Sequence, residues 1–91
     1  MNVFFKPTFI KDFKKLPSDI QREVHSLCTE AFPKLRSIRD LKNYNLKPIK
    51  GFPGYYRIRL GDYRIGFKLS GESKIECMRV KNRKDIYKHF P

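Results

Sequence analysis

Several features that mark common enzyme classes are missing from this sequence. It has no tryptophan, only two histidines and two cysteines, and its 9 acidic residues are outnumbered by 21 lysines and arginines. There is no glycine-rich phosphate loop, no HExxH, no CxxC pair and no nucleophile elbow. The acidic residues after Gly51 fall in turns or stand alone, so the converging carboxylates of a two-metal nuclease are not expected. They are Asp62, Glu72, Glu76 and Asp85.

Long apolar runs are missing as well. No stretch approaches the roughly 18 residues of a membrane-spanning helix, and residues 2–6 do not read as a signal peptide. Cys28 and Cys77 are far apart and sit in apolar patterns, one helical and one extended. We therefore expect buried free thiols rather than a metal site, and a cytoplasmic protein in a reducing compartment.

What the chain has in excess is positive charge. The net charge is +12 over 91 residues, and the excess is spread over both halves of the sequence. Residues 1–91 are therefore expected to form a single basic domain rather than a neutral domain with a basic tail. Such a charge favours polyanionic partners, nucleic acid first and acidic proteins second.

The most regular pattern lies in residues 54–69, which alternate on both sides of Gly61 and Asp62. These two residues can close a tight turn, so the pattern predicts a β-hairpin. Folding the hairpin about this turn gives an apolar surface with three facing pairs, Leu60–Tyr63, Ile58–Ile65 and Tyr56–Phe67.

The other surface of this hairpin is basic. Arg59 comes opposite Arg64, and Arg57 and Lys68 extend the same stripe. Like charges directly opposite each other destabilise a strand pair by up to about 1 kcal/mol. We therefore interpret the stripe as a binding surface for a long anion.

The rest of the chain predicts an α+β fold, with an N-terminal strand and a helical hairpin packed on a small sheet. Val3–Phe5 is the first strand, and Thr8 is expected to cap the first helix. Ser18 and Gln21 form a capping-box pattern for the second helix, which ends at Pro33. Residues 34–53 are expected to be a polar connection, with Leu46, Ile49 and Phe52 anchoring it to the core edge.

The last strand is predicted from Lys74 to about Val80. With Met78 and Val80 facing the core, Arg79 and Lys81 lie on the basic surface. Ile75 and Cys77 favour the opposite alternation, in which these two residues face the core. The sequence therefore leaves open which side chains of this strand are buried. A short helical turn is expected at residues 86–90.

Basic and aromatic residues are thus the candidates for chemistry. Arginine binds phosphate through two parallel hydrogen bonds and stacks on bases, and tyrosine supplies a ring and a hydroxyl. The candidates are Arg57, Arg59, Arg64 and Lys68 in the hairpin, and Arg79, Lys81, Arg83, Tyr87 and His89 near the end of the chain.

Three segments in this order resemble the RelE/ParE superfamily, the small toxins of bacterial and archaeal type II toxin–antitoxin pairs. They are Phe9-Ile-Lys-Asp-Phe-Lys-Lys-Leu16, the Tyr-Arg-Ile-Arg-x-Gly-Asp-Tyr-Arg-Ile run at 56–65, and Arg83-Lys-Asp-Ile-Tyr87. The resemblance covers nearly the whole chain. It implies a curved antiparallel sheet packed by an N-terminal helical hairpin.

The resemblance also implies a function. RelE-like members cut mRNA on the ribosome without metal or cofactor, by attack of a 2′-OH on the adjacent phosphate. It implies an antitoxin, the ribosome and mRNA as partners. The implied catalytic residues are Arg59, Arg64, Lys81, Arg83 and Tyr87, and the implied RNA-binding residues are Arg57, Lys68, Arg79 and His89. Arg64 resembles the transition-state arginine of the family, and Tyr87 the tyrosine that stacks or orients the substrate.

One position departs from the family pattern. The best-studied members carry lysines on the first hairpin strand, where this chain has Arg57 and Arg59. Arginine stays protonated in proteins and is a poor general base. The base is then Tyr87, Lys81 or His89, or the reaction relies on electrostatic stabilisation alone. The alternative function is that of a ParE-like toxin, which inhibits DNA gyrase by protein binding.

Overall fold

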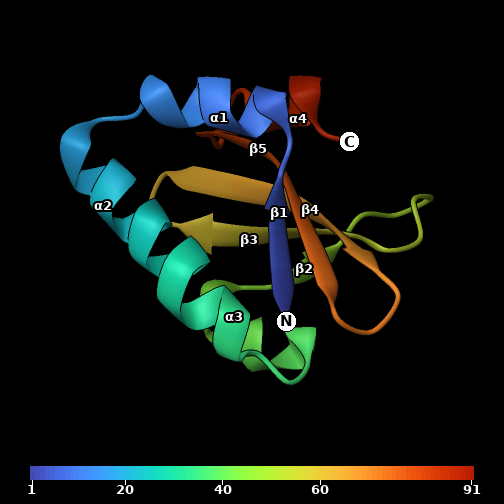
Figure 1. Cartoon of the computed structure of the whole chain (residues 1–91). Helices are drawn as coiled ribbons and strands as arrows, with labels where there is room; N and C mark the ends of the chain where they lie inside the picture. The colour runs from blue at the N-terminus through green and yellow to red at the C-terminus, as the bar shows by residue number, and fades with distance from the viewer.

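The chain forms one five-stranded sheet in the order β1-β5-β4-β3-β2, as the computed structural model of residues 1–91 shows (Figure 1). The strands are β1 (Asn2–Phe5), β2 (Lys47–Pro48), β3 (Tyr55–Leu60), β4 (Tyr63–Ser70) and β5 (Lys74–Asn82). Strand β1 pairs in parallel with β5, and all other pairs are antiparallel. The sheet is therefore mixed rather than purely antiparallel, because the N-terminal strand joins the far edge beside the last strand. The predicted α+β class is confirmed.

The predicted hairpin is confirmed in its turn and its register. Leu60 pairs with Tyr63, Ile58 with Ile65, Tyr56 with Phe67, and Arg59 with Arg64. Gly61 has a φ of 58°, the left-handed conformation that a tight turn needs and that glycine adopts at no steric cost. Ile58, Ile65 and Phe67 are fully buried, so the apolar surface of the hairpin is part of the core.

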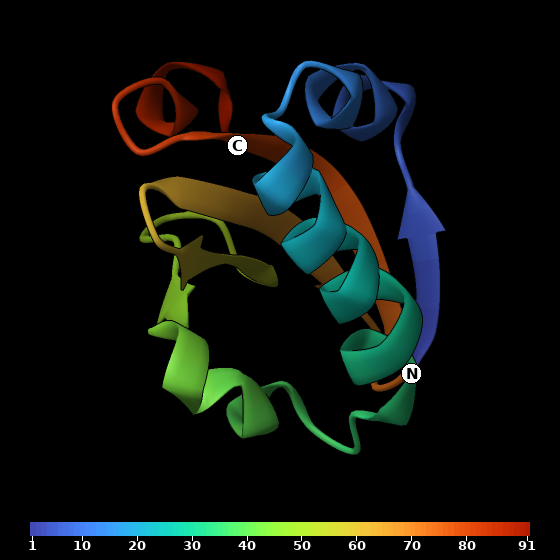
Figure 2. The same ribbon diagram turned by 90° about the vertical axis from the view of Figure 1, so that its left-hand side faces the viewer.

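One long helical layer covers the apolar face of the sheet (Figure 2). It consists of α2 (Ser18–Ser26), a π-helical turn η1 (Leu27–Ala31) and α3 (Phe32–Lys34). The π-helical turn ends two residues before Pro33, and Phe32 N–H donates to the Leu27 carbonyl, five residues back. Val24, Leu27 and Phe32 from this layer are buried in one core cluster with residues of the sheet, which is how an amphipathic helix packs on a sheet. No helix of the chain is long and apolar enough to cross a membrane.

The remaining helices are α1 (Pro7–Lys14), the 3₁₀ helix η2 (Ile38–Tyr44) and α4 (Ile86–His89). The predicted caps of the first two helices are wrong. Helix α1 starts with Pro7 at its first turn, and the Thr8 hydroxyl donates instead to the Met78 carbonyl at 2.8 Å. Helix α2 has no side-chain cap, because Gln21 donates to the Phe13 carbonyl of the preceding helix. The capping box is at η2, formed by Ser37 and Asp40.

A β-bulge settles the facing of β5. Gly66 pairs with Arg79 and Phe67 pairs with Cys77, which leaves Met78 as the extra residue. The bulge shifts the alternation by one position, so Cys77 before it and Val80 after it are both fully buried. The inward facing predicted for Ile75, Cys77 and Val80 is therefore confirmed, whereas that of Met78 is wrong, because Met78 is the half-buried extra residue of the bulge. The prediction of buried free thiols at Cys28 and Cys77 is also confirmed.

Candidate nucleic-acid interface

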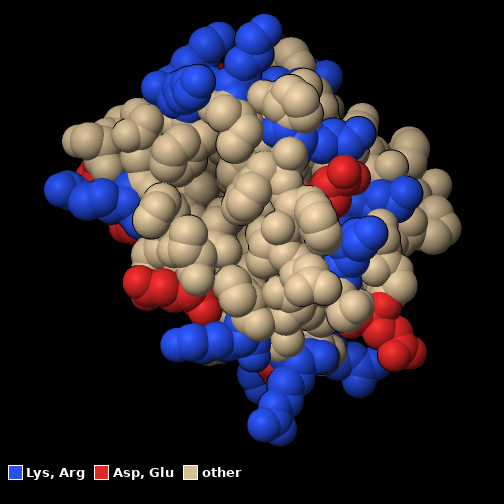
Figure 3. Space-filling model, in the orientation of Figure 1, with Lys and Arg blue, Asp and Glu red and all other residues tan.

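The face of the sheet opposite the long helical layer is basic. Arg57, Arg59, Arg64 and Lys68 lie on it, at positions that alternate with the buried residues of the hairpin, and we call this surface the basic face. Helix α4 returns along this side of the sheet (Figure 1). Lys and Arg side chains also gather along the upper rim of the molecule, over α1 and beside α4, while the middle of the surface in view is largely uncharged (Figure 3).

The hairpin turn holds two guanidinium groups together. Arg64 Nη1 donates to the carbonyl oxygens of Gly61 at 2.9 Å and Tyr63 at 3.0 Å. Arg59 Nε donates to the same Gly61 oxygen at 3.4 Å. These bonds occupy Nη1 of Arg64 and leave its Nε and Nη2 N–H groups without a partner in the protein. This free edge is the one with which arginine grips a phosphate through two parallel hydrogen bonds.

Further cations lie near Arg64, and their charges contribute to a shift of its pKa. Loss of hydration through burial, and then the charge of Arg59, lower the pKa of Arg64 below its ordinary value, with Arg57 and Arg83 acting in the same direction. Tyr87 opposes this shift. Arginine nevertheless stays charged at neutral pH. We call Arg57, Arg59, Arg64 and Arg83 the arginine cluster; its mutual repulsion is relieved when an anion binds.

Tyr87 lies at the edge of this cluster. It comes from α4, its side chain is 65% exposed, and the guanidinium carbon of Arg57 lies 4.6 Å from the centre of its ring. At this distance the cation and the ring attract each other. The exposed part of the ring is available to stack on a base. Arg57 therefore supports Tyr87 as well as adding charge to the basic face.

Helix α4 is fastened to the basic face by Phe90, which the sequence did not single out. Phe90 is buried, and its ring packs over Gly66 of β4 and lies 6.0 Å from the ring of Tyr55. A Cβ atom on Gly66 would come within 2.5–2.6 Å of three carbon atoms of the Phe90 ring. Only glycine at position 66 leaves room for this contact. A glycine inside a strand pattern was the available signal, because such a glycine often marks a close approach.

Two of the predicted residues are engaged elsewhere. Arg79 Nε and Nη2 donate to both carboxylate oxygens of the buried Asp12 in α1, at 2.8 and 3.1 Å, and Lys81 Nζ lies 3.4 Å from Asp12 Oδ1. Asp12 also accepts the backbone N–H of Val80 at 3.2 Å. This aspartate therefore ties α1 to the part of β5 that lies beyond its pairing with β1. Lys81 pairs with Arg64 in register, but its ammonium group lies beside Asp12 and not with the arginine cluster.

Asp12→Asn should lower the free energy of unfolding by about 2 kcal/mol, because it weakens hydrogen bonds to charged groups and leaves Arg79 without its counter-ion. Urea unfolding measures the loss. Asp19→Asn, an exposed position in the first turn of α2, is the matched control and should change stability by about 0.5 kcal/mol or less. Equal small effects of the two substitutions would show that the Asp12 network does not hold α1 in place.

Lys68 and His89 lie apart from the arginine cluster. Lys68 pairs with Tyr55 on one side and Glu76 on the other, and its Nζ lies 5.4 Å from the Tyr55 ring centre. An acidic residue therefore does lie on this end of the basic face. His89 is two residues after Tyr87, about 200° around the helix, so it does not share the direction of Tyr87. No group of three or more His, Cys, Asp or Glu side chains is placed to hold a metal ion.

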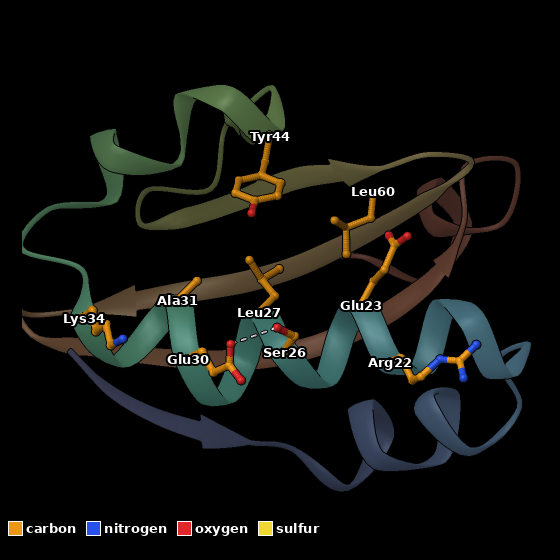
Figure 4. A pocket seen from close by; sticks show the side chains of 9 residues that line it. All are labelled: Arg22, Glu23, Ser26, Leu27, Glu30, Ala31, Lys34, Tyr44 and Leu60. Atoms are coloured by element: carbon orange, nitrogen blue, oxygen red, sulfur yellow. Dashed lines mark hydrogen bonds between the residues drawn. The ribbon is translucent and has the colours of Figure 1, made fainter.

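The largest hollow is a groove on the helical side of the sheet, with a volume of about 590 Å³ (Figure 4). Tyr44 of η2 and Leu27 of η1 point toward each other across it, and Leu60 points in from β3. Its helical wall carries two basic and two acidic residues, Arg22, Lys34, Glu23 and Glu30, and Ser26 donates to Glu30 at 3.2 Å. None of the predicted site residues lines it, so the candidate site is the open basic face and not the largest hollow.

Comparison with known proteins identifies the family. A sequence model described as the ParE toxin of the type II toxin–antitoxin system parDE matches residues 3–87. The chain belongs to the RelE/ParE superfamily. It is a toxin of a type II toxin–antitoxin system.

Individual relatives agree. The chain is 44% identical to Toxin RelE3 of Methanocaldococcus jannaschii over the full length of both. The toxin in the RelB–RelE antitoxin–toxin complex of Methanococcus jannaschii superposes with a TM-score of 0.78 at 41% identity, over 97% of this chain and 99% of that one. The RelBE2 complex of Mycobacterium tuberculosis matches with a TM-score of 0.68 at 23% identity, over 90% and 96%, and supports the fold alone.

Proposed function

We propose that this toxin is a ribosome-dependent endoribonuclease that cuts mRNA without metal. The 2′-OH of one nucleotide attacks the adjacent phosphate, and the bond to the 5′ oxygen of the next nucleotide breaks, which leaves a 2′,3′-cyclic phosphate and a 5′-OH. The observation that carries the proposal is the free Nε–Nη2 edge of Arg64 inside the arginine cluster, next to the exposed ring of Tyr87.

The arginine cluster supports a mechanism that rests on charge stabilisation. Negative charge builds up on the phosphate oxygens in the transition state, and guanidinium groups already fixed around that position stabilise it without reorganising. Arg64 is fixed by the turn carbonyls, and Arg59 shares one of them. Arg64 is therefore assigned to the phosphate under attack, and Arg59 to the flanking negative charge.

Proton transfer needs a different group, because arginine cannot give up its proton at neutral pH. Lys81 is paired with Asp12, and His89 is on another side of α4. Tyr87 is the remaining group at the cluster with a proton to exchange. Its ring is assigned to stacking on a base, and its hydroxyl to orienting or exchanging the proton of the reacting oxygen.

The proposed partner of the toxin outside the ribosome is an antitoxin with an acidic, amphipathic segment. The toxin of the similar Methanococcus jannaschii complex is bound to RelB. A net charge of +12 on 91 residues favours an acidic partner that also shields the basic face from nucleic acid. Purification of the toxin with its native neighbours should recover such a protein.

Affinity for short single-stranded RNA should fall steeply with salt, because each phosphate that is neutralised releases counter-ions. Arg57→Ala and Arg59→Ala should each reduce the slope of log affinity against log salt by about 0.7, the value for one phosphate contact on a single strand. Arg22→Ala, an exposed arginine on the helical side, is the matched control. Unchanged slopes in both hairpin variants would show that the basic face does not bind the phosphates.

The alternative is a toxin that inhibits DNA gyrase by protein binding, which the ParE description of the matching family favours. Inducing the toxin in cells and mapping RNA 5′ ends together with ribosome positions separates the two functions. A ribonuclease produces new mRNA ends at the decoding site of ribosomes. Growth arrest without new ends, accompanied by gyrase-dependent DNA breaks, would replace the proposed function by the alternative.

A further inference from the structure

Phe52 is not where the sequence pattern places it. Instead of anchoring the connection to the core, its side chain is 49% exposed in the loop between β2 and β3. This loop is held by backbone hydrogen bonds, from Phe52 N to Ile49 O at 3.1 Å and from Tyr55 N to Phe52 O at 3.1 Å. The Gly54 carbonyl accepts from Leu69 N of β4 at 2.8 Å. The loop is thus a defined turn that presents an apolar ring to solvent.

The ring of Phe52 continues a row of aromatic side chains on the basic face. Its edge meets the ring of Tyr55 at 6.0 Å and 73°, and Tyr55 in turn lies 6.0 Å from Phe90. Phe90 directly follows the short helix α4, which carries Tyr87 three residues earlier. The exposed rings of Phe52 and Tyr87 therefore lie on the same surface as the half-buried Tyr55 and the buried Phe90.

Positive charge accompanies this row. Lys68 Nζ lies 5.4 Å from the centre of the Tyr55 ring, and Arg57 lies over Tyr87. Glu76 neighbours Lys68 across the strands, but no carboxylate lies within 4.0 Å of the Lys68 ammonium, since the two close ion pairs of the chain both involve Asp12. The ammonium therefore remains available to a phosphate.

We propose that Phe52, Tyr55 and Lys68 form a second nucleotide subsite, for a base of single-stranded RNA that flanks the scissile bond. Exposed aromatic rings beside cations are the arrangement that binds single strands, because any base can stack on the ring while the cation contacts the backbone. A ring that served only a protein partner would not need to be continuous with the cations of the basic face. The inference rests on the proposed function, since it extends the RNA path from Tyr87 to the loop.

Binding of a short single-stranded RNA labelled with 2-aminopurine tests the subsite directly. Phe52→Ala should weaken binding about tenfold, the loss expected for one base stack, and should abolish the fluorescence change of one labelled base. Phe52→Tyr keeps a ring and should retain both. Phe5→Ala is the matched control, because Phe5 is 42% exposed and also packs on one aromatic ring, that of Phe9. Unlike Phe52, Phe5 lies in β1, where it pairs with the buried Cys77 of β5. Phe5→Ala should bind RNA as the parent does.

Cleavage on programmed ribosomes separates this proposal from the proposed function. Phe52→Ala should raise the toxin concentration needed for half-maximal cleavage, while the rate at saturation stays within about threefold of the parent. If the parent cuts and Phe52→Ala matches it in RNA binding and in cleavage, the subsite is wrong and the function stands. If Phe52→Ala weakens only an antitoxin complex, the ring is a protein contact and the subsite is likewise wrong. If the parent does not cut but Phe52-dependent RNA binding persists, the proposed function fails, and with it the place of the subsite beside a scissile bond, while Phe52 remains an RNA contact.

Discussion

Arg64→Ala should slow mRNA cleavage on the ribosome by about 10²-fold or more, the loss that follows removal of one preorganised charge donor. Binding to the ribosome should change little, because Arg64 acts on charge that develops in the transition state and many other cations remain. Single-turnover cleavage at saturating toxin measures the first quantity, and sedimentation with ribosomes measures the second.

Two further variants sharpen this result. Arg64→Lys keeps the charge but cannot offer the Nε–Nη2 edge, so it should recover only part of the rate. Tyr87→Phe keeps the ring: full activity would assign Tyr87 to stacking, and a large loss would assign its hydroxyl to proton transfer. Arg64→Ala with the native fold and an undiminished cleavage rate would remove Arg64 from the mechanism.

Gly66→Ala should both destabilise the toxin and reduce its activity. Alanine inside a strand is ordinarily better than glycine by about 0.5–1 kcal/mol. Here the new methyl group meets the Phe90 ring, which must leave its site, and the lost burial of a phenylalanine corresponds to about 1.5–3 kcal/mol. Since Phe90 fastens α4, Tyr87 would lose its position beside Arg57. We expect a net loss of about 2 kcal/mol in urea unfolding and a fall in cleavage rate of about tenfold.

The double variant with Phe90→Ala tests the cause. Without the ring, the methyl group at position 66 meets no obstacle, so Gly66→Ala in the Phe90→Ala background should have no cost or a small gain in stability. The two substitutions should therefore be strongly non-additive. If Gly66→Ala leaves stability and cleavage unchanged in the parent background, Phe90 does not hold α4 on the sheet.

The hairpin could be predicted from the sequence in full, including its register, because period-two alternation around a two-residue turn leaves one pairing only. The facing of β5 could not, because the bulge at Met78 depends on how β4 and β5 pair across the sheet. The helix caps failed for a related reason. Thr8 and Gln21 found tertiary partners, the carbonyls of Met78 and Phe13, that a local pattern does not contain.

The candidate site, too, could be predicted from the sequence only in part. Arg57, Arg59 and Arg64 follow from strand alternation, and the structure brings them together with Arg83 and Tyr87. Strand alternation also assigns Arg79 and Lys81 to this surface, but both side chains pair with the buried carboxylate of Asp12 in α1. Asp12 lies 67 residues before Arg79, so no spacing in the sequence links them. The contact of Phe90 with Gly66 and the exposure of Phe52 are likewise tertiary facts.

The most direct test of the central claim is the chemistry of the RNA ends that the purified toxin makes. Ribosomes carrying a defined mRNA, with one known codon in the decoding site, are incubated with the toxin, and the new termini are identified. The account predicts a single cut within that codon that leaves a 2′,3′-cyclic phosphate and a 5′-OH, reduced about 10²-fold by Arg64→Ala. Intact mRNA, or ends with a 5′ phosphate, would contradict it.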